Sequence, residues 1–120
     1  MATIDLDEQN FVDTVNNNDI VIIDFWAPWC GPCRSFAPVY EELSEEYSDV
    51  VFAKVNTEEQ QNIAAQFQIR SIPTLMIFRE QIILYQEAGA LPKQSLQQVV
   101  TQVKELDMEE VRKSLEESQD

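Results

Sequence analysis

The chain has 120 residues, of which 44% are apolar, and this composition suits one domain with one modest core. Its 22 acidic and 8 basic side chains give a formal net charge of −14, so nucleic-acid phosphates and anionic membrane surfaces would repel it. We therefore expect protein partners and exclude nucleic acid and membranes.

The N-terminal part of the chain carries no basic residue before Arg34, and so it lacks the positive region of a secretory signal peptide. No apolar run approaches the roughly 20 residues that a membrane span requires. These features predict a cytoplasmic protein. In a reducing compartment, two closely spaced cysteines are more often catalytic or metal-binding than structural.

The first half of the chain alternates expected strands and helices. A short strand is expected over residues 3–6, and Asp7 is placed to cap a helix that runs to about Asn17. The segment Ile20–Trp26 is a nearly continuous run of β-branched and aromatic residues. Such a run predicts a central strand that is buried on both faces.

The two cysteines follow this strand, and a helix is expected after them over Ser35–Tyr47, with a kink at Pro38. Val50–Asn56 is a second buried strand by the same criteria. Thr57 and Gln60 have the spacing of a capping box for the next helix.

The second half of the chain predicts a hairpin and two helices. The expected elements are strands over 74–78 and 82–85, a helix over 92–106 that has Pro92 in its first turn, and a short helix to about Ser118. Only three residues separate the two strands, so they should pair antiparallel. Asp107 resembles a new N-cap, and the apolar stripe changes phase there. We predict an α/β fold with a central mixed sheet of about five strands between helical layers and an extra short C-terminal helix.

The cysteines are spaced for dithiol chemistry. Cys30 should lie at a helix N-terminus, where free N–H groups and the helix dipole favour the thiolate that attacks disulfides. Cys33 lies one helical turn further along the same face and can displace whatever is bound to Cys30. Gly31 permits close backbone approach, and Pro32 lacks an N–H that the first turn would leave unpaired anyway.

Two other interpretations of the cysteine pair are weaker. A structural zinc site usually has four Cys or His ligands, but the chain contains no histidine and no third cysteine. We therefore expect no metal. A purely structural disulfide between these positions would close a very small loop, and this stabilises the fold little.

The residues around the cysteines resemble the thioredoxin family of the bacterial type. The resemblance is carried by Asp24, Trp26-Ala27-Pro28-Trp29-Cys30-Gly31-Pro32-Cys33-Arg34 and Ser71-Ile72-Pro73-Thr74. It extends in order and spacing from about Thr3 to Leu106, which implies a thioredoxin domain over 1–106 and an acidic helical extension over 107–120. It also implies the reduction of protein disulfides, with Cys30 as the nucleophile and Cys33 as the resolving thiol. The Gly-Pro pair between the cysteines is similar to that of reducing members.

The resemblance also assigns residues around the cysteines. It implies that Pro73 is cis and lies against the cysteine pair, beside an Ile72 backbone that offers hydrogen bonds to an extended substrate. It assigns substrate binding to Trp29, Ser71, Ile72, Pro73, Ala88 and Gly89, and the shaping of the site to Trp26, Trp29, Gly31, Pro32 and Pro73.

Asp24 interrupts an otherwise apolar strand, so its carboxylate should be desolvated and harder to ionise. The resemblance implies that Asp24 assists deprotonation of Cys33 and that Lys54 is its charge partner. The alternative is a structural Asp24–Lys54 pair that has no kinetic role.

The resemblance implies that the chain binds no cofactor and receives electrons from NADPH through a flavin-dependent thioredoxin reductase. It also implies a monomer that acts on disulfide-containing proteins. A second hypothesis is a thioredoxin-fold binding module that clamps a partner through Trp29, Ile72 and Gly89, with incidental redox turnover. Ser71 stands where the family often has glycine, and Thr57 stands where it often has an apolar residue. These departures concern partner choice more than chemistry.

Overall fold

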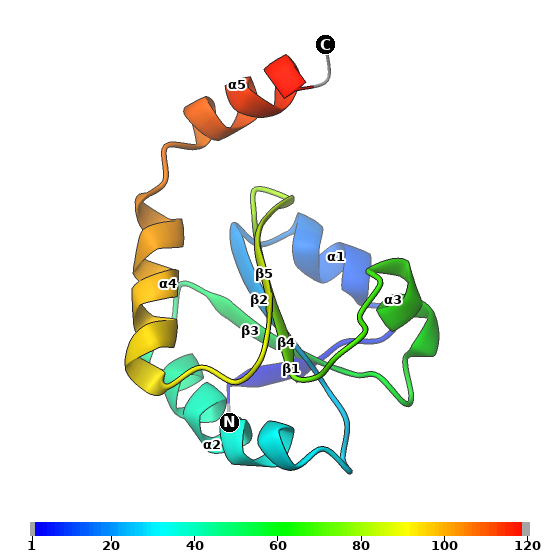
Figure 1. Cartoon of the computed structure of the whole chain (residues 1–120). Coiled ribbons are helices and arrows are strands. Elements are labelled where there is room, and N and C mark those ends of the chain that lie inside the picture. Colours follow the sequence, from blue (N-terminus) through cyan, green and yellow to red (C-terminus); the bar gives the residue numbers. More distant parts are fainter. Residues whose placement is uncertain (1, 119–120) are drawn as a thin grey trace.

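The computed structural model describes residues 2–118, which form a five-stranded sheet, helices that cover its two faces and a last helix that projects away from it (Figure 1). In chain order the elements are β1 (Thr3–Asp5), α1 (Phe11–Asn16), β2 (Ile20–Trp26), α2 (Gly31–Glu46), β3 (Val51–Asn56), α3 (Gln61–Gln66), β4 (Thr74–Arg79), β5 (Ile82–Ala88), α4 (Lys93–Glu105) and α5 (Met108–Ser118). Within residues 2–118, no helix is both long and apolar enough to cross a bilayer.

The strand order is β1-β3-β2-β4-β5, which places β2 at the centre of the sheet. β3 runs parallel to both β1 and β2, whereas β4 runs antiparallel to β2 and β5. The prediction of a mixed five-stranded sheet is thereby confirmed. The parallel register aligns Lys54 with Asp24 on one side and with Asp5 on the other. Side chains of directly aligned strand residues lie on the same face, so these three share one face of the sheet.

β2 is buried on both faces, as its continuous apolar sequence predicts. Ile20 and Ile22 belong to a core cluster that α2 and α4 cover, and Val21, Ile23 and Phe25 belong to a second cluster beneath α1 and α3. Because successive strand residues point to opposite faces, one run of β-branched and aromatic side chains supplies both cores.

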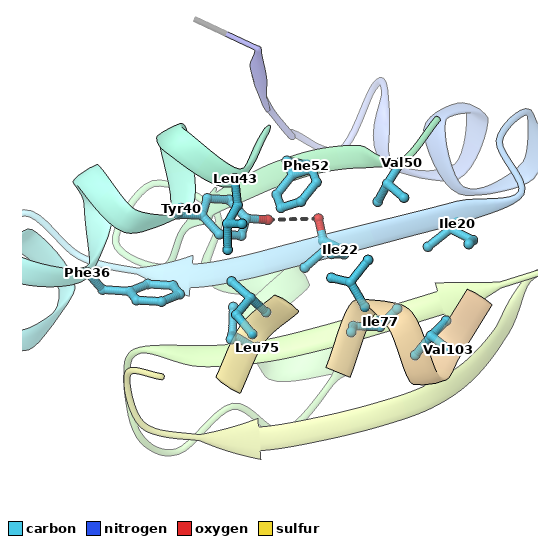
Figure 2. Packing of buried hydrophobic residues seen from close by; sticks show 12 residues of the cluster. Ile20, Ile22, Phe36, Tyr40, Leu43, Val50, Phe52, Leu75, Ile77 and Val103 are labelled. Atoms are coloured by element: carbon cyan, nitrogen blue, oxygen red, sulfur yellow. Dashed lines mark hydrogen bonds between the residues drawn. The ribbon is translucent and has the colours of Figure 1, made fainter. Parts of the chain in front are cut away.

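Tyr40 of α2 joins helix and sheet at the centre of the first core (Figure 2). Its hydroxyl oxygen lies 3.0 Å from the Ile22 carbonyl oxygen and 2.7 Å from that of Ala53, so its single proton is offered to two neighbouring strands. Its ring contacts the rings of Phe36 and Phe52 at centroid distances of 5.7 and 5.3 Å. Tyr40 therefore fixes how α2 lies across β2 and β3.

The structure corrects where α2 begins. The helix begins at Gly31 rather than at Ser35, with Cys30 as its N-cap, and it continues through Pro38. Pro32 fits the first turn because a backbone N–H there would have no intrahelical acceptor. The cysteine motif is thus the first turn of the helix itself.

The expected caps of α1 and α3 were also inaccurate. The Asp7 carboxylate accepts hydrogen bonds from the N–H groups of Gln9 and Asn10, closing a turn before α1 begins at Phe11. The predicted capping box of Thr57 is wrong, because both the N–H and the hydroxyl of Thr57 donate to the Trp26 carbonyl oxygen, at 2.8 and 3.1 Å. Thr57 therefore continues the pairing with β2, and α3 starts only after it.

The hairpin forms as predicted, with longer strands. Its two-residue turn, Glu80 and Gln81, has positive φ angles of 52° and 69°, as a turn that follows the natural twist of the strands requires. The separate last helix is also confirmed, since Asp107 Oδ1 accepts the N–H groups of Glu109 and Glu110. Pro92 precedes α4 as its N-cap, one position before the first turn.

We expect Tyr40→Phe to lower the free energy of unfolding by about 1–2 kcal/mol, because the ring contacts remain while two buried carbonyl groups lose their shared donor. Urea unfolding at neutral pH measures this change. Tyr85→Phe, at a half-buried position of β5, is the control. Equal effects of the two substitutions would contradict the role assigned to the Tyr40 hydroxyl.

Candidate active site

Cys30 and Cys33 lie where the central strand passes into α2, and they form a disulfide. Their exposed fractions are only 5% and 3%. Cys30 has extended backbone geometry at the N-cap, and its sulfur accepts a hydrogen bond from the Cys33 N–H at 3.2 Å. The N-terminus of α2 therefore directs a donor and the positive end of its dipole at the Cys30 sulfur, which favours a thiolate there after reduction.

A loop distant in sequence lies against the cysteines. The Ile72–Pro73 peptide bond is cis, as the resemblance implies, and the Ile72 carbonyl oxygen lies 3.8 Å from Cys30 Sγ. Gly89 donates its N–H to the Pro73 carbonyl oxygen at 2.8 Å and has a φ of 108°, which favours glycine. Ala88 pairs with Thr74 at the start of β4. The predicted rim residues thus lie on the segments beside the disulfide.

Trp29 lies next to Cys30 with 64% of its surface exposed. Its indole N–H donates to the Glu58 carboxylate. Sequence reasoning did not identify Glu58, because the contact depends on how the loop after β3 meets the loop after β2. Arg34 donates to the Pro28 carbonyl oxygen at 3.0 Å, across the loop that carries Trp29. An apolar surface beside a reactive sulfur is suited to contact with a protein substrate.

Asp24 lies on β2 with only 1% of its surface exposed, and its Oδ1 has no hydrogen-bond partner. Burial raises the pKa of Asp24 from 3.8 to about 7, and the positive charge of Lys54 lowers this pKa only partly. The expectation of a desolvated carboxylate that is harder to ionise is confirmed. Asp24 can therefore exchange a proton near neutral pH.

Lys54, the charge partner that the resemblance implies, acts on Asp24 without a direct ion pair. Among the ion pairs within residues 2–118, none joins Lys54 to Asp24. The Lys54 ammonium instead lies over the Trp26 ring, 4.6 Å from its centroid. A cation in this position is attracted to the ring and acts on Asp24 only through space. Trp26, which the resemblance assigns to the shaping of the site, therefore holds this cation.

Comparisons with known proteins agree with the geometry of the site. The family model described as "Thioredoxin" matches residues 2–102. "Putative thioredoxin 2" of Streptomyces coelicolor is 52% identical over 118 residues, which are 98% of this chain and 88% of that protein. "Thioredoxin 1" of Synechococcus elongatus is 54% identical over 77 residues, or 63% of this chain and 72% of that protein. The solved structure of a mutant thioredoxin from Halobacterium salinarum NRC-1 has a TM-score of 0.79 at 32% identity, covering 88% of this chain and 93% of that one.

We expect Asp24→Asn to stabilise the fold at pH 8 but not at pH 4. The pKa of Asp24 is about 7 in the folded chain against 3.8 as its ordinary value, so stability is lost as the pH rises between these values and stays lower above them. The full effect is at most about 4 kcal/mol. Urea unfolding of the oxidised protein at the two pH values measures it.

Glu116→Gln, at an exposed position of α5, is the control that makes the same change in net charge. The prediction would be contradicted if Asp24→Asn raised the free energy of unfolding equally at both pH values, or by no more than the control does. Asp24 would then not be an ionisable group that is buried in the fold.

Proposed function

The chain belongs to the thioredoxin family of thiol–disulfide oxidoreductases, and we propose that Cys30 is its nucleophile and Cys33 its resolving thiol. The observation that carries this assignment is the hydrogen bond from the Cys33 N–H to the Cys30 sulfur at the N-terminus of α2. That donor stabilises negative charge on Cys30 but not on Cys33, so Cys30 is the sulfur that ionises first.

The reaction follows in two exchange steps. The Cys30 thiolate attacks one sulfur of the substrate disulfide, forming a mixed disulfide while the other substrate sulfur leaves as a thiolate and takes up a proton. Cys33 then loses its proton and attacks the Cys30 sulfur, so the mixed disulfide breaks and the second substrate thiolate leaves. The substrate gains two electrons, and the enzyme is left with the Cys30–Cys33 disulfide.

Asp24 is the proposed acceptor for the Cys33 proton. Its pKa of about 7 suits a group that must take up and release a proton near neutral pH, and burial within the fold supplies this pKa. Lys54 limits the rise of this pKa, because its positive charge favours the charged form of Asp24. Both residues are therefore assigned to catalysis rather than to a purely structural pair.

Substrate binding is assigned to the surface around Cys30. Trp29 offers exposed apolar area, and the backbone beside Pro73 offers hydrogen bonds to an extended segment of substrate, with Ser71, Ile72, Ala88 and Gly89 along the rim. This arrangement requires little from the side chains of the substrate, which suits an enzyme that acts on several disulfide proteins.

Regeneration requires an electron donor, which we assign to a flavin-dependent thioredoxin reductase using NADPH. The thioredoxin family works with thioredoxin reductase and with disulfide substrates, and thioredoxin itself binds no cofactor, which supports this assignment. We further propose a cytoplasmic monomer whose chemistry lies in residues 1–106, with 107–120 as an appended extension. The high net negative charge, which opposes self-association, supports the monomer.

We expect Cys33→Ser to accumulate mixed disulfides between Cys30 and its substrates, because the second exchange step is removed. Non-reducing gels of lysate incubated with the purified variant measure this accumulation. Cys30→Ser and the double variant are the controls, and neither should trap protein. Trapping by Cys30→Ser instead of Cys33→Ser would reverse the two roles, and full cellular function of the double variant would favour a binding module.

We expect Asp24→Asn to slow the reduction of a protein disulfide at pH 7–8 by about 10–100-fold, at or below the lower limit of general-base effects because water can also accept the proton. Insulin reduction with a chemical reductant, followed from pH 6 to 9, measures the rate. The inflection near the pKa of Asp24 should disappear in the variant. Rates that match those of the unsubstituted protein at every pH would leave Asp24 a structural role only.

A further inference from the structure

The Lys54 side chain borders a cleft at the carboxyl ends of β1, β2 and β3, beside the loop that follows β3. The cleft has a volume of about 220 Å³ and is lined by Asp5, Leu6, Asp7, Trp26, Lys54, Asn56, Glu59 and Gln60. Three of these residues are acids, and Lys54 supplies the only positive charge among them. The Lys54 ammonium therefore lies between an acidic cleft and the buried carboxylate of Asp24.

The register of three strands defines this arrangement. β1, β3 and β2 are adjacent and parallel, and Asp5, Lys54 and Asp24 are direct partners across them. One cation is thus flanked in a single row by an exposed carboxylate on the edge strand and a buried carboxylate on the central strand. Coulombic attraction falls with distance, so any movement of the ammonium toward one carboxylate weakens its effect on the other.

Other charged or titratable groups face this row. From the cleft, Lys54 faces Asp7 and Glu59 besides Asp5, and from α2 the Tyr40 hydroxyl interacts electrostatically with Asp24. The Asp7 carboxylate is occupied by two backbone N–H groups. Within residues 2–118, no hydrogen bond or ion pair engages the Asp5 side chain. Asp5 is therefore available to interact with Lys54.

We propose that Asp5 is a positioning residue for Asp24, which attracts the Lys54 ammonium toward the open cleft and so limits the support that Lys54 gives to the Asp24 carboxylate. The proposal rests on the assigned role of Asp24 only where it concerns the rate. The Lys54 ammonium lies over the Trp26 ring, 4.6 Å from its centroid, on the strand between those that carry the two carboxylates. An exposed residue of the edge strand thereby sets the proton affinity of a group inside the fold.

The test is an NMR titration of the Asp24 carboxyl carbon in the full chain at low ionic strength. We expect Asp5→Asn to lower the proton affinity of Asp24 about two- to threefold, an effect of the size expected for one partly exposed charge pair. Lys54→Met, which keeps an apolar chain on Trp26, should raise the affinity. Asp13→Asn, on the exposed surface of α1 over the other face of the sheet, is the charge-matched control and should have no effect.

A double-variant cycle separates action through Lys54 from direct repulsion. In the Lys54→Met background, Asp5→Asn should leave the titration of Asp24 unchanged, because the shared cation is gone. A shift that persists there, or a shift for Asp5→Asn no larger than for Asp13→Asn, would overturn the proposal. The effect should also weaken in 0.5 M salt, since Asp5 is exposed.

The kinetic consequence is tested separately. The pH at which disulfide reduction reaches half its maximal rate should move down in Asp5→Asn in parallel with the Asp24 titration. If the titration moves while the rate profile does not, the coupling stands and the proposed proton-acceptor role of Asp24 fails. If the titration does not move, the coupling fails whatever the rates show.

Discussion

The burial of β2 on both faces is the constraint from which the site follows. Five of the seven residues of this strand fill two cores, and the same strand carries Asp24 into the interior and delivers the cysteines to the start of α2. A carboxylate in such a strand cannot be solvated, so its altered proton affinity is a consequence of the fold rather than of a specialised pocket. Tyr40, bound to the backbones of β2 and β3, holds α2 and therefore the cysteines in place over this strand.

The charges of Cys30 and Asp24 are controlled by opposite electrostatic effects. At Cys30, a helix N-terminus and one N–H group favour negative charge. At Asp24, burial disfavours negative charge and raises the pKa, and the Lys54 cation held on Trp26 lowers this pKa only in part. The first effect stabilises the proposed attacking thiolate of Cys30, and the second keeps Asp24, the proposed proton acceptor, about half-ionised near neutral pH. This arrangement lowers the free energy of unfolding above neutral pH, because the carboxylate inside the core is then ionised.

The sequence predicts those features of the fold and the site that depend on a few adjacent residues. The apolar run of β2, the position of Cys30 at a helix start, the hairpin and the cap at Asp107 are each visible in a few adjacent residues. Contacts between loops are not visible in this way. Glu58 reaches Trp29, and Lys54 turns to the Trp26 ring, only because β3 lies beside β2 in a particular register. The predicted cap at Thr57 failed for the same reason, since pairing with Trp26 of the neighbouring strand overrode a local motif.

The attachment of α5 bears on what the extension contributes. α5 projects away from the sheet in Figure 1, and its described anchors are the buried Met108 and an ion pair between Arg112 and Glu80 of the hairpin turn. β4 starts beside Pro73 and ends at Arg79, so the hairpin turn lies at the far end of β4 from the disulfide. The described anchors of α5 therefore lie away from the disulfide, and none of the residues that line the cleft at Lys54 belongs to this helix.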